Sequence, residues 1–415
     1  MQSQKTILLL ITLVLIIGGI WYLQSKKVTP SFTEGELTEE SFVQVPETVP
    51  VPSGDTSGGE VDQGIETSSE VEKAIADTRT DAKADVQREV VPESIYPRAP
   101  EISTIDGYIN VDDITIAGEI AKGNIVLLDV WTYSCINCQR TIPFLNNWQE
   151  KYGDKGLTII GLHTPEFEFE KKYENVVLAV DRFDIEYPVV LDNDYSTWQA
   201  YKNQYWPRKY LINLDGRIVY DHIGEGGYEE TEQTIIEWLN KTRTVRDGAE
   251  LSFEGMEIEE QPRTQGQLLS RESYLGYERI EYVHPAPDQS CVESVCSFEK
   301  QEATPPGRFS FEGDWQLERE RSVLKSSEGS IWVNFIGSSV NLVAGSVDGL
   351  AKGAEIYLDG ALIDQGAGAA VQDGKVLFLE EKLYQLVNLE EHGSHLLEIR
   401  LENAKDFAGF AFTFG

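Results

Sequence analysis

Between residues 102 and 246, short apolar runs alternate with amphipathic stretches. Residues 124–131 read NIVLLDVW, a continuous apolar run that is typical of a buried central strand. In residues 139–152 the apolar positions Ile142, Leu145 and Trp148 fall on one helical face. An Asp-Gly pair at 215–216 predicts a hairpin turn. The pattern as a whole predicts an α/β domain with strands over 124–131 and 157–162, helices over 139–152 and 175–183, a short helix over 198–205, a hairpin over 209–223 and a helix over 231–241.

After residue 246 the periodicity changes to that of short strands. Apolar and polar residues alternate with a period of two, and Gly or Asp-Gly pairs separate the runs. We therefore expect an all-β domain, a jelly-roll-like sandwich of two sheets. The expected strands follow Glu312-Gly-Asp-Trp and cover residues 330–335, 339–344, 355–358, 361–363, 375–379, 395–401 and 409–414.

The first residues predict a single-pass membrane anchor. Residues 6–23 are uncharged and mostly apolar, close to the length that spans the hydrocarbon of a bilayer, and Trp21 and Tyr22 suit its interface. A cleaved signal peptide is the alternative, although no A-x-A pattern follows the run. Residues 28–98 are acidic and rich in Pro, Gly and Ser, which indicates a disordered linker. The expected organisation is thus an anchor over 1–27, a linker over 28–98, the α/β domain over 99–246 and the β-sandwich over 247–415.

The net charge and the number of cysteines exclude two classes of protein. The 415 residues include 35 Lys and Arg against 70 Asp and Glu, a formal charge of −35. This acidic balance excludes a general nucleic-acid binder, because phosphate contacts need clustered Lys and Arg. Four Cys in a chain of this length exclude a disulfide-scaffold protein.

The strongest chemical signal is the C-x-x-C motif formed by Cys135 and Cys138. It follows the 124–131 strand and opens the 139–152 helix. The N–H groups and dipole of a helix N-terminus favour a thiolate, which is the species that attacks a disulfide. Cys138, one turn along, can resolve the mixed disulfide. We therefore assign Cys135 as the nucleophile and Cys138 as the resolving thiol; half of a zinc site and a structural disulfide are the alternatives.

Four further residues fit this chemistry. Asp129 lies on the strand beneath the cysteines, where a buried carboxylate can take or return the proton of Cys138. An ordinary strand-end acid is the alternative. Pro207 follows Trp206 just before the hairpin, and a cis peptide bond there would face the C-x-x-C and leave neighbouring backbone free to pair with an extended substrate. A plain trans turn is the other reading. We expect Trp131, Trp206 and Pro207 to line a substrate groove.

These residues resemble the thioredoxin-like domain of the DipZ and TlpA/redoxin group of thiol–disulfide oxidoreductases, which act outside the cytoplasm. The resemblance implies that Cys135 and Cys138 form a redox-active disulfide and that Pro207 is a cis-proline. Ser134 departs from the group, since many relatives have Trp there. DipZ proteins also carry a polytopic electron-transferring membrane domain, so a separate, CcdA-like membrane partner is implied. The similar segments are DVWTYSCINCQRTIPFLNNW, IIGLHTPEFEFE, VLDNDYSTWQAY, YWPRKYLINLDG and HIGEGGYEETE.

The C-terminal region is similar to the second domain of DipZ proteins, which looks like a carbohydrate-binding module. The resemblance is carried by RESYLGYERI, GDW, KLYQLV and AGFAFTFG. Trp315 and Trp332 are candidates for a glycan-stacking platform, but alternate aromatics of a sandwich usually face its core. Cys291 and Cys296 lie in a loop before the strands, where we expect a structural disulfide; a second redox pair is the alternative.

The sequence therefore predicts a thiol–disulfide oxidoreductase with no cofactor or metal, held at the cell membrane with its globular domains outside the cytoplasm. Its expected substrates are thiols and disulfides of exported proteins, apocytochromes among them. Net disulfide formation is one alternative direction. A glycan- or partner-binding protein with a non-catalytic thioredoxin scaffold is the rival from another class.

Overall fold

The computed structural model describes residues 96–243, 250–256, 258 and 268–415. The predicted anchor over residues 6–23 and almost all of the predicted linker over 28–98 lie outside the described residues. Among the helices that the structure describes, none has the length and apolar character needed to cross a membrane.

The first domain is built on a six-stranded sheet of order β1-β4-β3-β2-β5-β6. The central strands β2, β3 and β4 are parallel, and β1, β5 and β6 run antiparallel to their neighbours. Buried parallel strands are expected to be apolar on both faces, and β2 is buried at all seven positions. The strands are β1 (Gly107–Ile109), β2 (Ile125–Trp131), β3 (Leu157–His163), β4 (Val189–Leu191), β5 (Arg208–Ile212) and β6 (Ile218–Ile223).

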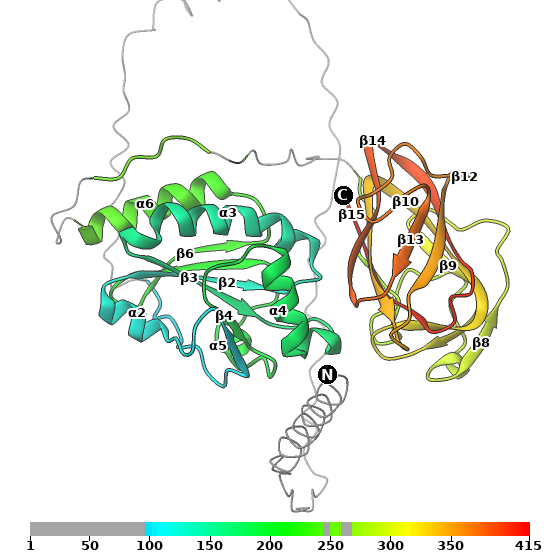
Figure 1. Ribbon diagram of the computed structural model, residues 1–415, viewed down its shortest axis with the longest axis horizontal. Coiled ribbons are helices and arrows are strands. Elements are labelled where there is room, and N and C mark those ends of the chain that lie inside the picture. The colour runs from blue at the N-terminus through cyan, green and yellow to red at the C-terminus, as the bar shows by residue number, and fades with distance from the viewer. Residues whose placement is uncertain (1–95, 244–249, 257, 259–267) are drawn as a thin grey trace, which may run out of the picture. The chain divides into compact units, whose positions relative to one another are not determined.

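Helices cover both faces of this sheet (Figure 1). Alternate residues of β2 point to opposite faces: Leu127 packs into the core beneath α3 and α6, whereas Leu128 packs into the core on the side of α2. Asp129 shares the face of Leu127 and therefore points toward α3. The helices are α2 (Ile116–Lys122), α3 (Ile136–Tyr152), α4 (Tyr173–Arg182), α5 (Ser196–Ala200) and α6 (Tyr228–Arg243), with 3-10 turns η2 (Gly153–Lys155) and η3 (Glu168–Lys171).

The predicted α/β, thioredoxin-like architecture of this domain is confirmed. Its helices start earlier than the apolar periodicity alone indicated: α3 begins at Ile136 and α6 at Tyr228, each three residues before the predicted start. The first turn of each helix is polar or exposed on one side, so periodicity carries little signal there. Pro143 lies within α3.

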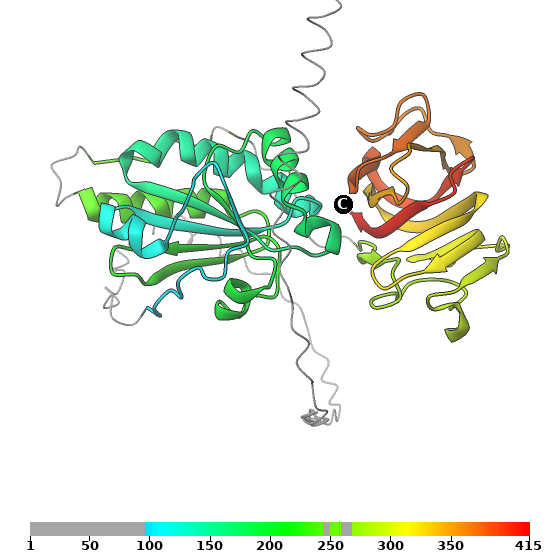
Figure 2. The ribbon, with the colours of Figure 1, turned by 60° about the horizontal axis from the view of Figure 1, so that its bottom comes forward.

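The second domain is all-β, as the alternating pattern predicted, but its described strands form one nine-stranded sheet rather than the two separate sheets that we expected of a sandwich. The sheet is strongly curled (Figure 2). The two ends of β10 lie on either side of β15, because Val323 near the start of β10 and Gly345 near its end both pair with Ala408 of β15. The strands are β7 (Ser273–Tyr274), β8 (Val295–Phe298), β9 (Arg308–Leu317), β10 (Ser322–Ser346), β11 (Lys352–Leu358), β12 (Ala361–Leu362), β13 (Lys375–Phe378), β14 (Lys382–Leu401) and β15 (Phe407–Phe414). The curled sheet encloses an aromatic core of Phe309, Phe311, Trp315, Phe335, Phe378, Phe407 and Phe412.

Two expectations about these strands were wrong. Residues 330–335 and 339–344 are not separate strands but parts of the 25-residue β10, because a register shift between Gly337 and Ser339 bends the strand without ending it. Glu312-Gly-Asp-Trp does not precede the strands but lies within β9. Glycine at both places resembles a turn signal in the sequence.

Candidate active site

Cys135 is the N-cap residue of α3 and is half-buried. Its backbone is extended (φ −80°, ψ 119°), and its Sγ accepts a hydrogen bond from the backbone N–H of Cys138 at 3.4 Å. The first turn of the helix contains no acidic residue. Sγ thus lies at the positive end of the helix dipole, which stabilises a thiolate.

Cys138 lies one turn farther into α3 and is only 1% exposed. Both cysteines are free thiols in this structure. Burial raises the pKa of Cys138 well above its usual range, and the adjacent Cys135 and the Asp129 carboxylate add to this effect. The partly exposed sulfur of Cys135 is therefore next to the buried sulfur of Cys138. The buried Cys138 thiol needs a proton acceptor before it can react as a thiolate.

Asp129 has the burial and the raised pKa expected of such an acceptor. It is 1% exposed and lies in the middle of β2, on the face that α3 covers. Burial raises its pKa to about 7, against the opposing charge of Lys209. Its Oδ1 has no hydrogen-bond partner among the described residues. A carboxyl group with a pKa near 7 can both take and return a proton at neutral pH.

Lys209 is a member of this site that the sequence analysis missed. It pairs with Asp129 across the antiparallel strands β2 and β5, and it is fully buried. Its Nζ donates a hydrogen bond to the carbonyl of Gly224 at 3.2 Å and lies over the ring of Tyr228. A lysine inside an apolar strand, two residues after the predicted cis-proline, was the available signal.

The Trp206–Pro207 peptide bond is cis. Trp206 is half-buried, stacks on Trp198 with ring centroids 4.2 Å apart, and donates from Nε1 to the carbonyl of Thr164 at 3.0 Å. These contacts fix the aromatic side chain beside Pro207, which begins the turn into β5. Trp198, on α5, is a partner of Trp206 that the sequence analysis did not identify.

Trp131 does not line a groove, and that expectation was wrong. Its side chain is 0% exposed and packs edge-on against His163, with ring centroids 5.1 Å apart. The position ends a strand that is buried on both faces, so the indole belongs to the core. His163 is also fully buried, and burial lowers its pKa to about 3. It is a neutral packing residue beneath the loop that carries Cys135.

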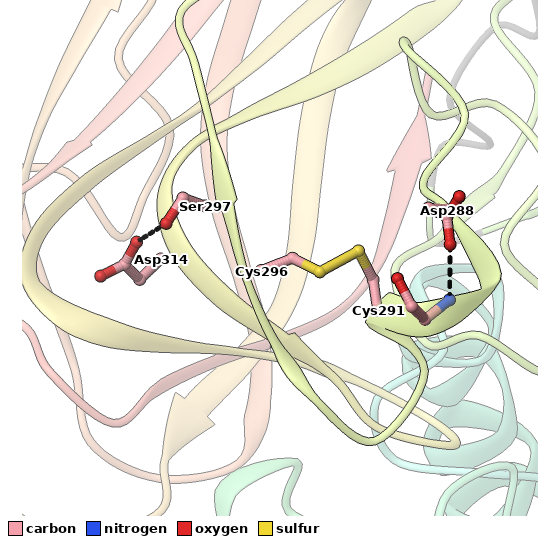
Figure 3. Close-up of a disulfide and its surroundings, with 6 residues drawn as sticks. Asp288, Cys291, Cys296, Ser297 and Asp314 are labelled. Carbon is pink, nitrogen blue, oxygen red and sulfur yellow. Dashed lines mark hydrogen bonds between the residues drawn. A yellow bond between two sulfur atoms is a disulfide. The ribbon is translucent and has the colours of Figure 1, made fainter.

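Cys291 and Cys296 form a disulfide in the second domain (Figure 3), with an S–S distance of 2.07 Å and Cα atoms 5.5 Å apart. Asp288 caps the 3-10 turn Gln289–Cys291 by accepting from Ser290 N, and Ser297 bonds Asp314 of β9. The disulfide therefore ties a capped turn to β8. Because these two sulfurs bond each other, they cannot complete a zinc site with Cys135 and Cys138.

The two tryptophans proposed as a stacking platform do not lie on one face. Trp315 is fully buried and packs against Phe311 and Phe407 in the core, so a platform that includes it is ruled out. Trp332 is half-buried, with the Lys300 ammonium over its ring at 4.1 Å. Among the described residues, no group of three or more His, Cys, Asp or Glu side chains could hold a metal ion.

Comparisons with known proteins agree with this geometry. Residues 98–235 match the family model described as Redoxin, and residues 270–415 match the model described as Thioredoxin like C-terminal domain. Over 322 residues, 76% of this chain, the sequence is 31% identical to Protein DipZ of Mycobacterium bovis and of Mycobacterium tuberculosis, and the match covers 43% of each relative. The chain thus spans less than half the length of these relatives. Thiol-disulfide oxidoreductase ResA of Bacillus cereus is 32% identical over 111 residues, which are 27% of this chain and 61% of ResA. The chain therefore joins a region that matches the Redoxin model to a region that matches the thioredoxin-like C-terminal domain.

Proposed function

We propose that the protein is a thiol–disulfide oxidoreductase that exchanges disulfides in exported proteins. One observation carries the proposal: a half-buried Cys135 caps α3, and a sealed Cys138 lies one turn behind it, in reach of its Sγ. Relatives whose names describe thiol–disulfide oxidoreductases support the same activity. No cofactor is required, because the two sulfurs carry both electrons.

In the reductive direction, the Cys135 thiolate attacks one sulfur of the substrate disulfide. The substrate S–S bond breaks, a Cys135–substrate disulfide forms, and the other substrate sulfur leaves as a thiolate. Cys138 then gives its proton to Asp129 and attacks Cys135 Sγ. This step forms the Cys135–Cys138 disulfide and releases the second substrate thiolate. The substrate gains two electrons, and the protein is oxidised by two.

The pair of tryptophans beside the cis peptide bond supports binding of an extended substrate. Trp206 lies at the surface next to Pro207, and its indole is fixed by Trp198 and by the Thr164 carbonyl. An extended peptide can pair its backbone with the chain at such a position while the fixed aromatic ring packs on its side chains.

An insulin-reduction assay with dithiothreitol tests the enzymatic role. Cys135→Ser should abolish turnover, whereas a variant with both Cys291 and Cys296 changed to Ser should retain it. Unchanged turnover in Cys135→Ser would overturn the proposal in favour of a binding protein on a thioredoxin scaffold.

The direction of electron flow depends on the reduction potential of the Cys135–Cys138 pair. A reductase needs a separate dithiol donor to reduce this pair after each cycle, and we propose a CcdA-like membrane protein for that step. Equilibration with glutathione should give a value near that of thioredoxin, about −270 mV. A value near about −120 mV would instead assign net disulfide formation.

We also propose a site of action at the outer face of the cell membrane, with the apolar segment over 6–23 as anchor and the acidic stretch over 28–98 as tether. The disulfide between Cys291 and Cys296 supports an oxidising compartment. Apocytochromes are candidate substrates there. Protease treatment of intact cells should remove the globular domains, and their protection would contradict this location.

A further inference from the structure

A buried carboxylate holds the residue that precedes Cys135. Glu170, in the turn η3 after β3, is 0% exposed. Its Oε1 accepts from Ser134 Oγ at 2.6 Å and from Ser134 N at 3.2 Å. Its Oε2 accepts from Phe167 N at 3.0 Å and from Glu166 N. Both oxygens thus face donors, which suits the ionised form.

The contact adds a charged hydrogen bond between two segments that also meet through the rings of Tyr133 and Phe169, 5.9 Å apart. Ser134 lies in the short loop between β2 and α3, and Glu170 lies 36 residues later. Elsewhere this loop is held by Gln139, whose Nε2 donates to the carbonyl of Tyr133 at 2.8 Å. Ser134 itself is 1% exposed, so water cannot replace the carboxylate. The approach of the backbone to Cys135 is therefore fixed from η3.

The charge of Glu170 also matters to the neighbouring sulfur. Burial raises the pKa of Glu170, and the hydrogen bond from Ser134 opposes that shift. A carboxylate in a dry interior acts on nearby charges far more strongly than one in water. Removing it should therefore favour the reduced state of the cysteine pair that begins one residue beyond Ser134.

We propose that Glu170 is a positioning residue of the redox site: it fixes Ser134, and with it the backbone leading into Cys135, and its charge biases the cysteine pair toward the disulfide. The inference rests on the proposed role of Cys135 as attacking sulfur. It identifies a residue that acts through Ser134 and that touches neither sulfur nor substrate.

The first test is the equilibrium of the Cys135–Cys138 pair with glutathione, measured by mass spectrometry on the full chain. Glu170→Gln should shift this equilibrium at least threefold toward the dithiol. Glu168→Gln is the matched control: it removes an equal charge from the same turn, but its side chain is 63% exposed, so the shift should stay below twofold. Equal shifts in the two variants, or none in Glu170→Gln, would overturn the charge effect and with it the proposal.

The second test separates positioning from a general structural role. Ser134→Ala removes one hydroxyl and should slow alkylation of Cys135 by iodoacetamide about tenfold. Glu170→Gln should slow it by as much. Both rates are measured at alkaline pH, so that the charge of Glu170 does not change the fraction of thiolate. The double variant with Glu170→Gln should be no slower than Glu170→Gln alone, because the two side chains act as a unit. Additive losses would overturn the proposal. If Glu170→Gln does not fold, Ser134→Ala alone tests the positioning role of Glu170. A Cys135 alkylation rate in Ser134→Ala equal to that of wild type would refute the proposal.

These outcomes are distinct from failure of the proposed function. A wild-type chain whose Cys135 and Cys138 never form a disulfide with glutathione would overturn both. A wild-type pair that equilibrates normally, together with an inert Glu170→Gln substitution, would remove only the role of Glu170.

Discussion

Burial shifts the pKa values of Asp129 and His163, two side chains under the active-site loop, in opposite directions. It raises the pKa of Asp129 to about 7 and lowers that of His163 to about 3, since in both cases the neutral form is favoured in a dry interior. At neutral pH His163 is therefore inert, whereas Asp129 is poised to exchange a proton. Only one of two neighbouring buried groups is suited to acid–base chemistry.

Asp129→Asn should slow turnover on the order of 10²-fold, because Cys138 loses its proton acceptor. Insulin reduction at pH 7 measures this effect. Alkylation of Cys135 serves as the control and should change less than twofold, since Asp129 acts on the other sulfur. A full turnover rate in Asp129→Asn would show that Cys138 releases its proton elsewhere.

The same substitution should change how stability depends on pH. The folded pKa of Asp129 lies above its ordinary value of 3.8, so its contribution to folding is complete below about pH 4 and is lost as the pH rises through 7. Relative to wild type, Asp129→Asn should gain up to about 4 kcal/mol of unfolding free energy between pH 4 and pH 8. His163 contributes in the opposite sense, losing stability as the pH falls below about 6.5, but it does so in both proteins. Urea unfolding across this pH range measures the difference, and parallel curves would contradict the assignment.

At the scale of elements, short helices and turns place the reactive groups. The helix α5 is only five residues long, yet it carries Trp198, the residue on which Trp206 stacks. A helix of this length has little intrinsic stability. The buried carboxylate of Asp192 supplies it by accepting from the backbone N–H groups of Thr197 and Trp198, both at 2.9 Å.

Asp192→Ala should therefore lower the free energy of unfolding by about 1–3 kcal/mol, because it leaves buried N–H donors without an acceptor. It should also reduce kcat/KM for insulin, since Trp198 no longer holds Trp206 in place. The exposed Asp181 provides a matched control, and Asp181→Ala should change stability by less than about 0.5 kcal/mol. If the two variants behave alike, Asp192 does not organise the groove.

Much of this arrangement could be predicted from the sequence, for physical reasons that differ between elements. The strand before Cys135 is apolar at nearly every position, and the C-x-x-C spacing fits a helix start, so both are visible locally. Glu170 could not be found in this way, because its role depends on a contact across 36 residues. Lys209 stands out locally as a lysine in an apolar strand, but its pairing with Asp129 depends on two antiparallel strands. Trp131 was expected to line a groove, but its strand is buried on both faces.

At the scale of the molecule, the chain uses its four cysteines in two different ways. The pair in the first domain is reduced and lies at a helix start, whereas the pair in the second domain is oxidised and closes a six-residue loop. Cys135 caps the 17-residue helix α3, whose N-terminus carries a partial positive charge. Cys291 ends a 3-10 turn of only three residues, which has no comparable dipole. The two domains therefore differ in cysteine chemistry as well as in fold.

Replacing both Cys291 and Cys296 with Ser should lower the stability of the second domain by about 2 kcal/mol, as expected for loss of a short cross-link. Thermal unfolding followed by tryptophan fluorescence measures this loss. The glutathione equilibrium of the Cys135–Cys138 pair should remain within twofold of wild type. A larger change would indicate that the second pair takes part in electron transfer.

The burial of Cys138 has a practical consequence for finding clients. In Cys138→Ser, a mixed disulfide on Cys135 has no internal sulfur to break it. Such a variant, expressed in its native host, would stay joined to its substrates through the mixed disulfide, which survives purification under denaturing conditions. Sequencing the captured peptides would then name the physiological substrates directly.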